Sequence, residues 1–179
     1  MTTVFCSNKL EKLLGLIVEN PSPDIGNALG NWNGHLFTFD RKKNLIFMND
    51  NTAYTFVLLN IKKADLKDFK NVFKESLINQ LYNDLKITER QEIEVRKWIS
   101  DIQLAKTNNN KKILGTINDF VLTIKAIAYE QGGLTRMTNL SIGHGLNNYI
   151  IGTKLEGVKK SYSVPKELME NLLHKLLGS

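Results

Sequence analysis

The sequence predicts an α+β protein, with an antiparallel sheet of about four to six strands packed by helices. Two observations carry this prediction. Three β-rich runs follow one another between residues 32 and 59, joined by short turn-rich links. Links this short force neighbouring strands to run antiparallel, so the runs form a three-stranded meander. After residue 65 the apolar residues instead recur mostly at helical spacing.

The elements before the meander are a strand, a helix and a loop. Thr2–Cys6 is rich in β-branched and aromatic residues, which is typical of a strand. Asn8, with Glu11 three residues later, predicts the start of a helix. Glu19–Gly30 contains two prolines and two glycines and is predicted to be a surface loop.

The meander strands are predicted at Trp32–Phe39, Leu45–Met48 and Ala53–Leu59. The links Asp40–Asn44 and Asn49–Thr52 contain Asp and Asn, whose side chains bond nearby backbone N–H groups and tolerate left-handed φ. The second and third strands carry apolar residues on both faces. We therefore expect the sheet to be covered at least partly on both sides.

Helices dominate the middle of the chain. Apolar residues share one face from Asp65 to about Leu85, and Thr88–Gln91 is a capping-box pattern that opens a second helix. A short strand is predicted at Gln103–Thr107. The longest and most apolar helix follows at Ile113–Gln131 and ends at a pair of glycines.

The last third of the sequence gives weaker signals. Thr138–Asn148 fits either a short helix or a loop, and Lys159–Val164 fits an edge strand whose lysines discourage pairing with another chain. Pro165 suits the first turn of a final helix. The chain shows no repeat and no linker, so residues 1–179 are expected to form a single globular domain.

Composition limits the class of protein. The hydrophobic share of 42% and the charged share of 23% are those of an ordinary soluble protein. No apolar run approaches the ~20 residues that cross a bilayer, and the first residues lack a signal-peptide pattern. Cys6 is the single cysteine, and the three histidines are scattered. We expect a cytoplasmic protein with no membrane contact, no metal and no cofactor.

The net charge of +6 suggests nucleic-acid binding. Two facts support the plainer explanation that the positive charge has no role in binding. Only four of the basic residues are arginine, the side chain that recognises guanine edges and phosphates in a bidentate way, and the lysines are spread along the chain. Lys, Asn and Ile are all abundant, as the codon bias of an AT-rich genome alone would produce.

Two groups of residues are candidates for ligand binding. Trp32 opens the meander and Arg41, Lys42 and Lys43 follow in its first link. This pairing can stack a base and hold its phosphates. The preferred explanation is a core tryptophan beside a solvated turn.

The second group surrounds the start of the longest helix. Lys106, Thr107, Asn108 and Asn118 are predicted to line an anion- or ligand-binding cleft. The structural alternative is that Thr107 or Asn108 caps backbone donors in this loop.

A catalytic set is also conceivable. His35 lies in the first meander strand and can act as a general base with Asp40 or Asp119, with or without Mg²⁺. The structural alternatives are a half-buried strand histidine and an Asp119 held by the positive end of a helix dipole. The set requires these groups to meet in one cleft.

Two blocks of unusual composition are Trp32 with Asp40–Lys43, and Lys106–Asn108 with Leu114–Asp119. Together with other blocks in the same order, they resemble a bacterial family described only as a domain of unknown function. The other blocks are Leu29–Asn31, Phe47-x-Asn49, Thr52-x-Tyr54, Gly132–Leu134 and Leu146-Asn147. The resemblance runs from Thr2 to about Leu168 and implies a small stand-alone cytoplasmic protein without assigned chemistry. The family pattern leads us to expect an arginine after Asn108, where this sequence has Asn109–Lys112.

Three functions follow as hypotheses. The first is a non-enzymatic binding module for protein or nucleic acid. The second is a small hydrolase or nuclease that uses His35 with Asp40 or Asp119. The third is a self-associating protein, a homodimer for example, that pairs through the meander edge or the last helix.

Overall fold

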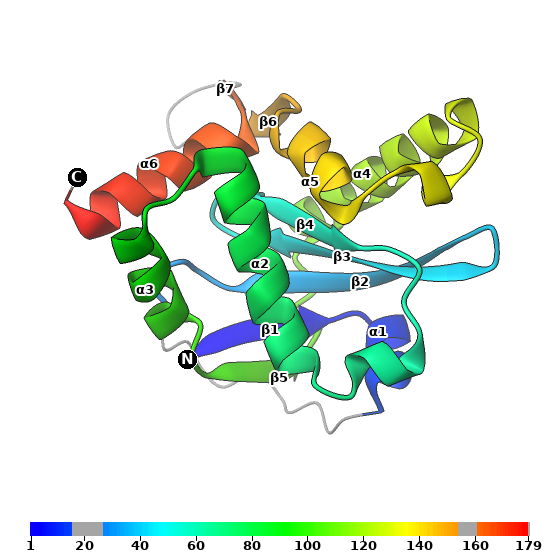
Figure 1. Ribbon diagram of the computed structural model, residues 1–179, viewed down its shortest axis with the longest axis horizontal. Helices are drawn as coiled ribbons and strands as arrows, with labels where there is room; N and C mark the ends of the chain where they lie inside the picture. Colours follow the sequence, from blue (N-terminus) through cyan, green and yellow to red (C-terminus); the bar gives the residue numbers. More distant parts are fainter. Residues whose placement is uncertain (16–26, 154–160, 179) are drawn as a thin grey trace.

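The structure is a computed structural model that describes residues 1–15, 27–153 and 161–178 (Figure 1). A five-stranded sheet in the order β4-β3-β2-β1-β5 has helices on both faces. The strands are β1 (Thr2–Cys6), β2 (Trp32–Phe39), β3 (Lys42–Asn49), β4 (Thr55–Leu58) and β5 (Ile102–Lys106). The helices are α1 (Asn8–Leu14), α2 (Phe69–Leu85), α3 (Glu89–Trp98), α4 (Lys111–Glu130), α5 (Asn139–Asn147) and α6 (Pro165–Leu177). The α+β class and the predicted meander are confirmed.

Smaller elements complete the described part of the chain. Two 3₁₀ turns lie at Lys63–Leu66 and Leu134–Arg136, and β6 (Ile151–Thr153) pairs with β7 (Ser161–Ser163) as a separate ribbon. The predicted loop Glu19–Gly30 and the predicted strand Lys159–Val164 each begin outside the described residues. None of the described helices is long and apolar enough to cross a membrane.

The sheet is mixed, because β1 runs parallel to both of its neighbours. β2, β3 and β4 form the antiparallel meander, whereas β1 pairs in parallel with β2 on one side and with β5 on the other. Parallel neighbours need a crossover connection. Here α1 lies in the connection from β1 to β2, and α2 and α3 lie between the meander and β5.

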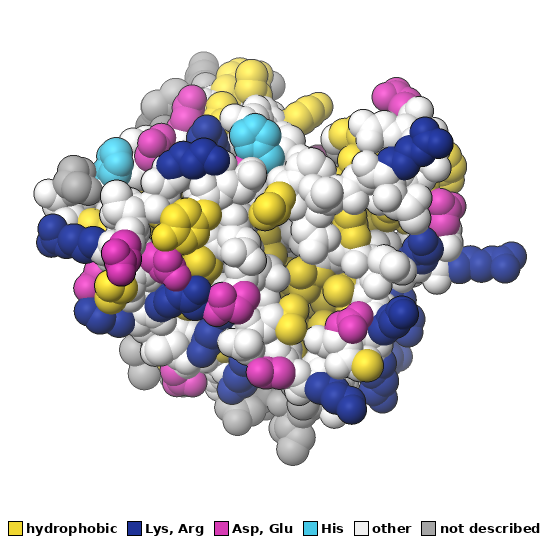
Figure 2. Space-filling view, viewed as in Figure 1, with side chains coloured by type: hydrophobic (Ala, Val, Ile, Leu, Met, Phe, Trp, Pro, Cys, Tyr) yellow, Lys and Arg dark blue, Asp and Glu magenta, His cyan; other side chains and the backbone are white. Residues whose placement is uncertain are grey.

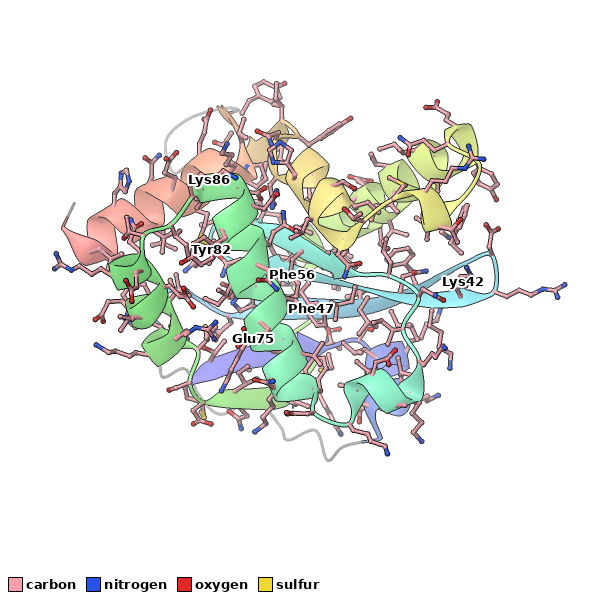
Figure 3. All side chains as sticks on the ribbon, viewed as in Figure 1. Lys42, Phe47, Phe56, Glu75, Tyr82 and Lys86 are labelled. Carbon is pink, nitrogen blue, oxygen red and sulfur yellow. The ribbon has the colours of Figure 1, made fainter. Side chains whose placement is uncertain are left out.

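Two apolar cores lie on opposite faces of the sheet. Leu45 and Phe47 of β3 pack under α1, α2, α3 and α6, and the alternate residues Ile46 and Met48 pack under α4 and α5. Phe47 stacks on Phe56 with ring centres 4.9 Å apart, beneath α2 (Figure 3). The alternation of side chains along a strand explains why β3 is apolar throughout, and the prediction of a sheet covered on both sides is confirmed.

The link between β2 and β3 is shorter than predicted. Phe39 pairs directly with Lys42, so the turn contains only Asp40 and Arg41, with φ of 46° and 60°. Positive φ at both central residues is the geometry of a type I′ turn, whose twist matches that of the flanking strands. The hairpin therefore projects Arg41 at its tip.

Helix α5 seals the outer edge of the meander. The Asn147 side chain accepts a hydrogen bond from the Thr55 backbone N–H (2.7 Å) and donates one to the Thr55 carbonyl (2.8 Å). The Asn139 side chain accepts from the Leu59 N–H at 3.0 Å. These side-chain amides thus occupy backbone N–H and C=O groups at the sheet edge, which an added strand would need for pairing. The meander edge is therefore not a free pairing surface, and of the two surfaces named for self-association the last helix is left.

Candidate functional site

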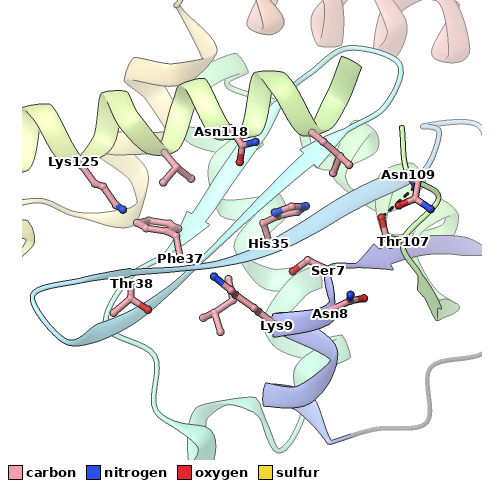
Figure 4. A pocket seen from close by; sticks show the side chains of 13 residues that line it. Ser7, Asn8, Lys9, His35, Phe37, Thr38, Thr107, Asn109, Asn118 and Lys125 are labelled. Carbon is pink, nitrogen blue, oxygen red and sulfur yellow. Dashed lines mark hydrogen bonds between the residues drawn. The ribbon is translucent and has the colours of Figure 1, made fainter. Parts of the chain in front are cut away.

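A cleft of about 570 Å³ lies beyond the carboxyl ends of β1 and β5 (Figure 4). After β1 the chain enters α1 on one face of the sheet, and after β5 it enters α4 on the opposite face. Where parallel neighbours send their connections to opposite faces, a crevice opens at their carboxyl ends, and ligands commonly bind there. We call this site the switch cleft. Its lining residues are Ser7, Asn8, Lys9, His35, Leu36, Phe37, Thr38, Thr107, Asn109, Leu114, Asn118, Val121 and Lys125.

One wall of the switch cleft is the exposed part of β2. β1 ends at Cys6, paired with Gly34, and the Ser7 N–H donates to the Gly34 carbonyl at 3.0 Å. β2 continues for several residues beyond this point. Since peptide groups alternate along a strand, those of Leu36 and Thr38 turn toward the same open side as Gly34.

The opposite wall is one face of α4. Leu114, Asn118, Val121 and Lys125 are three or four residues apart and therefore share a helix face. Figure 4 shows Asn118 and Lys125 pointing from α4 into the space above β2. His35 points into the same space from β2, between Asn118 and Lys9 of α1.

The electrostatics of the switch cleft favour an anion. Lys9 and Lys125 line it, and none of its lining residues is acidic. Burial lowers the pKa of His35, and the nearby charge of Lys9 lowers it further. The imidazole is consequently uncharged at neutral pH. It can gain a proton when an anion binds beside it.

The predicted anion-binding residues are only partly brought together. Thr107 and Asn118 line the switch cleft, whereas Lys106 and Asn108 are exposed and do not. The Asn108 side-chain oxygen accepts a hydrogen bond from the backbone N–H of Asn110 at 3.1 Å. Asn108 therefore shapes the loop before α4, as the structural alternative proposed. Sequence analysis did not identify Ser7, Lys9 or Lys125, which reach the cleft only through the crossing of α1 and α4 over the sheet.

The proposed stacking role of Trp32 is wrong. Its side chain is 0% exposed and lies between Phe56 and Phe73, each with its ring centre 5.6 Å away. A base can stack only on an exposed ring face. Arg41 and Lys43 are exposed at the hairpin, as a binding role requires, and Lys42 is half-buried beside a separate cavity.

The proposed catalytic set does not assemble. Asp40 lies in the hairpin turn at the far end of β2, beside Gly133. Asp119 lines a different cavity, with Tyr149. Neither carboxylate lines the switch cleft with His35. The structure therefore does not bring together, in the switch cleft, the three residues on which the hydrolase hypothesis rests.

A buried carboxylate network was not predicted. The Asp84 side chain is 0% exposed and accepts hydrogen bonds from five side chains. They are the Tyr54 hydroxyl (2.8 Å), the amides of Gln80 (3.1 Å), Asn83 (3.0 Å) and Asn147 (2.8 Å), and His144 Nδ1 (2.8 Å). Burial raises the pKa of Asp84, but the hydrogen bonds from Asn147, His144 and Tyr54 outweigh it and lower the pKa overall. The carboxylate is therefore ionised at neutral pH.

The network joins elements that are distant in the sequence. Tyr54 precedes β4, Asp84 is on α2, and His144 and Asn147 are on α5. Its close fit explains Gly143, where an added Cβ would collide with the Gln80 side chain. Burial, followed by the charge of Asp84, raises the pKa of Tyr54, so the phenol stays protonated and donates. At many catalytic bases a carboxylate orients a histidine in this way. Here the His144 ring is 50% exposed. Its other nearby side-chain partner is the amide of Asn148.

Metal and thiol chemistry find no support among residues 1–15, 27–153 and 161–178. These ranges contain no group of three or more His, Cys, Asp or Glu side chains able to hold a metal ion. Burial, with a smaller contribution from Glu11, raises the pKa of Cys6 to about 12. The buried thiol is therefore protonated and a poor nucleophile.

The comparison with known families bears out the sequence resemblance. No curated protein matches the chain. Residues 3–168 match the model of a family whose description is "Domain of unknown function (DUF6933)". This match spans most of the chain, including β1 from its second residue, the meander, β5, α4 and α5. The chain therefore belongs to the family described as a domain of unknown function, DUF6933.

Proposed function

We propose that the protein is a non-enzymatic binding module whose switch cleft holds a phosphorylated ligand of about the size of a mononucleotide. The observation that carries the proposal is the pairing of Lys9 and Lys125 with His35 in a cleft without carboxylates. Charge-assisted hydrogen bonds to a phosphate are roughly twice as strong as neutral ones. The proposal includes a cytoplasmic location, where a free thiol such as that of Cys6 persists.

The rest of the cleft suits an organic group attached to the phosphate. Phe37, Leu114 and Val121 provide apolar surface, and Thr107 and Asn118 provide polar atoms. A volume of about 570 Å³ lies within the range of small-molecule sites. A concave site of this kind encloses a nucleotide better than the broad surface of a protein partner.

Positive charge is less concentrated on the face covered by α2 and α3 than in the switch cleft. On the face covered by α2 and α3, basic and acidic side chains are interspersed (Figure 2). Arg96 on this face is bound by Glu75 and Glu92, at 2.6 Å each. This face therefore offers no continuous basic surface for a nucleic acid. Self-association through α6 remains a separate prediction, which light scattering checks.

Calorimetric titration with adenosine 5′-monophosphate tests the proposal. We expect this nucleotide to bind more tightly than adenosine or inorganic phosphate alone, because each occupies only part of the cleft. The double variant Lys9→Ala/Lys125→Ala should weaken nucleotide binding by about tenfold or more, since two charged contacts are lost. The matched control Lys67→Ala/Lys70→Ala removes two exposed lysines, one just before α2 and one in its first turn, and should leave binding unchanged. Equal affinity for adenosine and its monophosphate would contradict the proposal.

Ligand binding is expected to take up a proton at His35. The pKa of free His35 is lowered, and a bound phosphate raises it because the negative charge favours the imidazolium. Affinity should then rise as the pH falls from about 8 toward 6.5. Calorimetry in two buffers of different ionisation enthalpy measures the proton uptake directly. His35→Asn should abolish this uptake, and an identical uptake in that variant would show that another group titrates.

A further inference from the structure

The switch cleft continues toward the hairpin. Tyr129 lies one helical turn beyond Lys125 on α4, on the side of the helix that lines the cleft. Phe39 follows Phe37 on the same face of β2. The rings of Phe39 and Tyr129 meet edge to face, with centres 5.0 Å apart and planes at 70°. The two walls of the cleft thus end at an aromatic pair.

This aromatic pair leaves a surface on which a base can stack. The Tyr129 side chain is 75% exposed, whereas Phe39 beneath it is buried. The edge-to-face contact fixes the tyrosine without covering both faces of its ring. Arg41 is exposed at the hairpin tip, two residues beyond Phe39. An exposed ring near a cation is an arrangement by which proteins bind single-stranded nucleic acids.

We propose that the ligand is the phosphorylated end of a single-stranded nucleic acid. The terminal nucleotide occupies the switch cleft, the base of the next nucleotide stacks on Tyr129, and the phosphate beyond it meets Arg41. This inference rests on the proposed function, because it needs a phosphate in the cleft. The rise from Lys125 to Tyr129 is about 6 Å along the helix, a distance that one extended nucleotide step spans.

The charges at the hairpin end set the expected strength of the electrostatic contribution. Asp40 and Glu130 are also at this end and offset the charge of Arg41. Stacking is therefore expected to contribute more than charge to binding at this end. If Lys9, Lys125 and Arg41 each neutralise one phosphate charge, the slope of log affinity against log salt is about −2 for a single strand.

Titration with tetranucleotides tests this inference separately from the proposed function. The probes are adenosine monophosphate and single-stranded DNA and RNA tetranucleotides with a phosphate at the 5′ or the 3′ end. At least one tetranucleotide should bind wild-type protein about tenfold or more tightly than the mononucleotide, since stacking of one base is worth that much. Arg41→Ala should reduce the salt slope from about −2 to about −1.4.

Three variants of α4 identify the stacking residue. Tyr129→Ala should lose the gain of the tetranucleotide and keep the affinity for the mononucleotide, and Tyr129→Phe should keep both. Leu122→Ala, which removes another exposed side chain from the same helix, should change neither. A tetranucleotide that binds no more tightly than the mononucleotide, or a gain that survives Tyr129→Ala, overturns the inference and leaves the proposed function standing. Failure of the mononucleotide itself to bind overturns both.

Discussion

Replacing Asp84 with alanine is expected to lower the free energy of unfolding by about 3–5 kcal/mol. The carboxylate is fully buried and accepts hydrogen bonds from five side chains. Its removal leaves the Tyr54 hydroxyl and the Asn147 amide buried without their acceptor, and each unsatisfied group costs about 1–3 kcal/mol. Urea denaturation measures the loss as a lower midpoint at constant slope.

The matched variants separate the buried carboxylate from its exposed neighbour. His144→Ala removes a half-exposed ring and should cost far less than Asp84→Ala. Asp84→Asn keeps the shape and loses the charge, so it should lie between them. Equal losses from His144→Ala and Asp84→Ala would show that the histidine, and not the buried carboxylate, is central to the network.

The contribution of Asp84 depends on pH in a defined direction. Its pKa in the folded protein is lowered, while the unfolded chain has the ordinary value of about 3.9. A group with a lowered folded pKa stabilises the protein above its unfolded pKa, and this stability is lost as the pH falls toward the folded value. The difference in stability between wild type and Asp84→Asn should therefore narrow below about pH 4. A difference that grows on acidification would contradict the account of this network.

Replacing Trp32 with alanine is expected to cost about 3–5 kcal/mol of stability and to leave ligand affinity unchanged. The indole fills the core between Phe56 and Phe73 and reaches no part of the switch cleft. Denaturation gives the stability, and calorimetry with adenosine monophosphate gives the affinity. Unchanged stability with lost binding would instead restore the stacking role that the sequence suggested.

Trp32→Phe is the conservative control for this core position. The indole Nε1 has no hydrogen-bond partner among the described residues, so its removal leaves no acceptor unsatisfied. The remaining cost comes from the smaller ring and the space it leaves. We therefore expect Trp32→Phe to be clearly milder than Trp32→Ala.

Local signals in the sequence predicted local structure well. Thr88 caps α3 in a capping box, and β2 spans the predicted residues Trp32–Phe39. The apolar stripe of α4 was visible because helix periodicity needs no knowledge of the rest of the fold. For Thr138–Asn148 the sequence did not distinguish a helix from a loop, because the two inner glycines weaken the helical signal.

Local signals could not predict how segments distant in the sequence pack together. Nothing in Thr2–Cys6 reveals that this strand runs parallel to both neighbours, and the switch cleft depends on that pairing. For the same reason Lys9 and Lys125 looked like ordinary surface lysines. The network around Asp84 could not be predicted, because its five donors come from Tyr54 before β4, from α2 and from α5, and they meet only in the folded chain. The stacking hypothesis for Trp32 fails and the alternative of a core tryptophan is confirmed, because exposure cannot be read from residue type alone.

The central claim is that the switch cleft holds a phosphorylated ligand, and the amide ¹H–¹⁵N spectrum during titration with adenosine monophosphate tests it most directly. The account predicts the largest shifts at Ser7, Lys9, Thr107 and Asn118, with α6 and the Asp84 network little changed. Shifts concentrated away from these residues, or no shift at millimolar nucleotide, would contradict it.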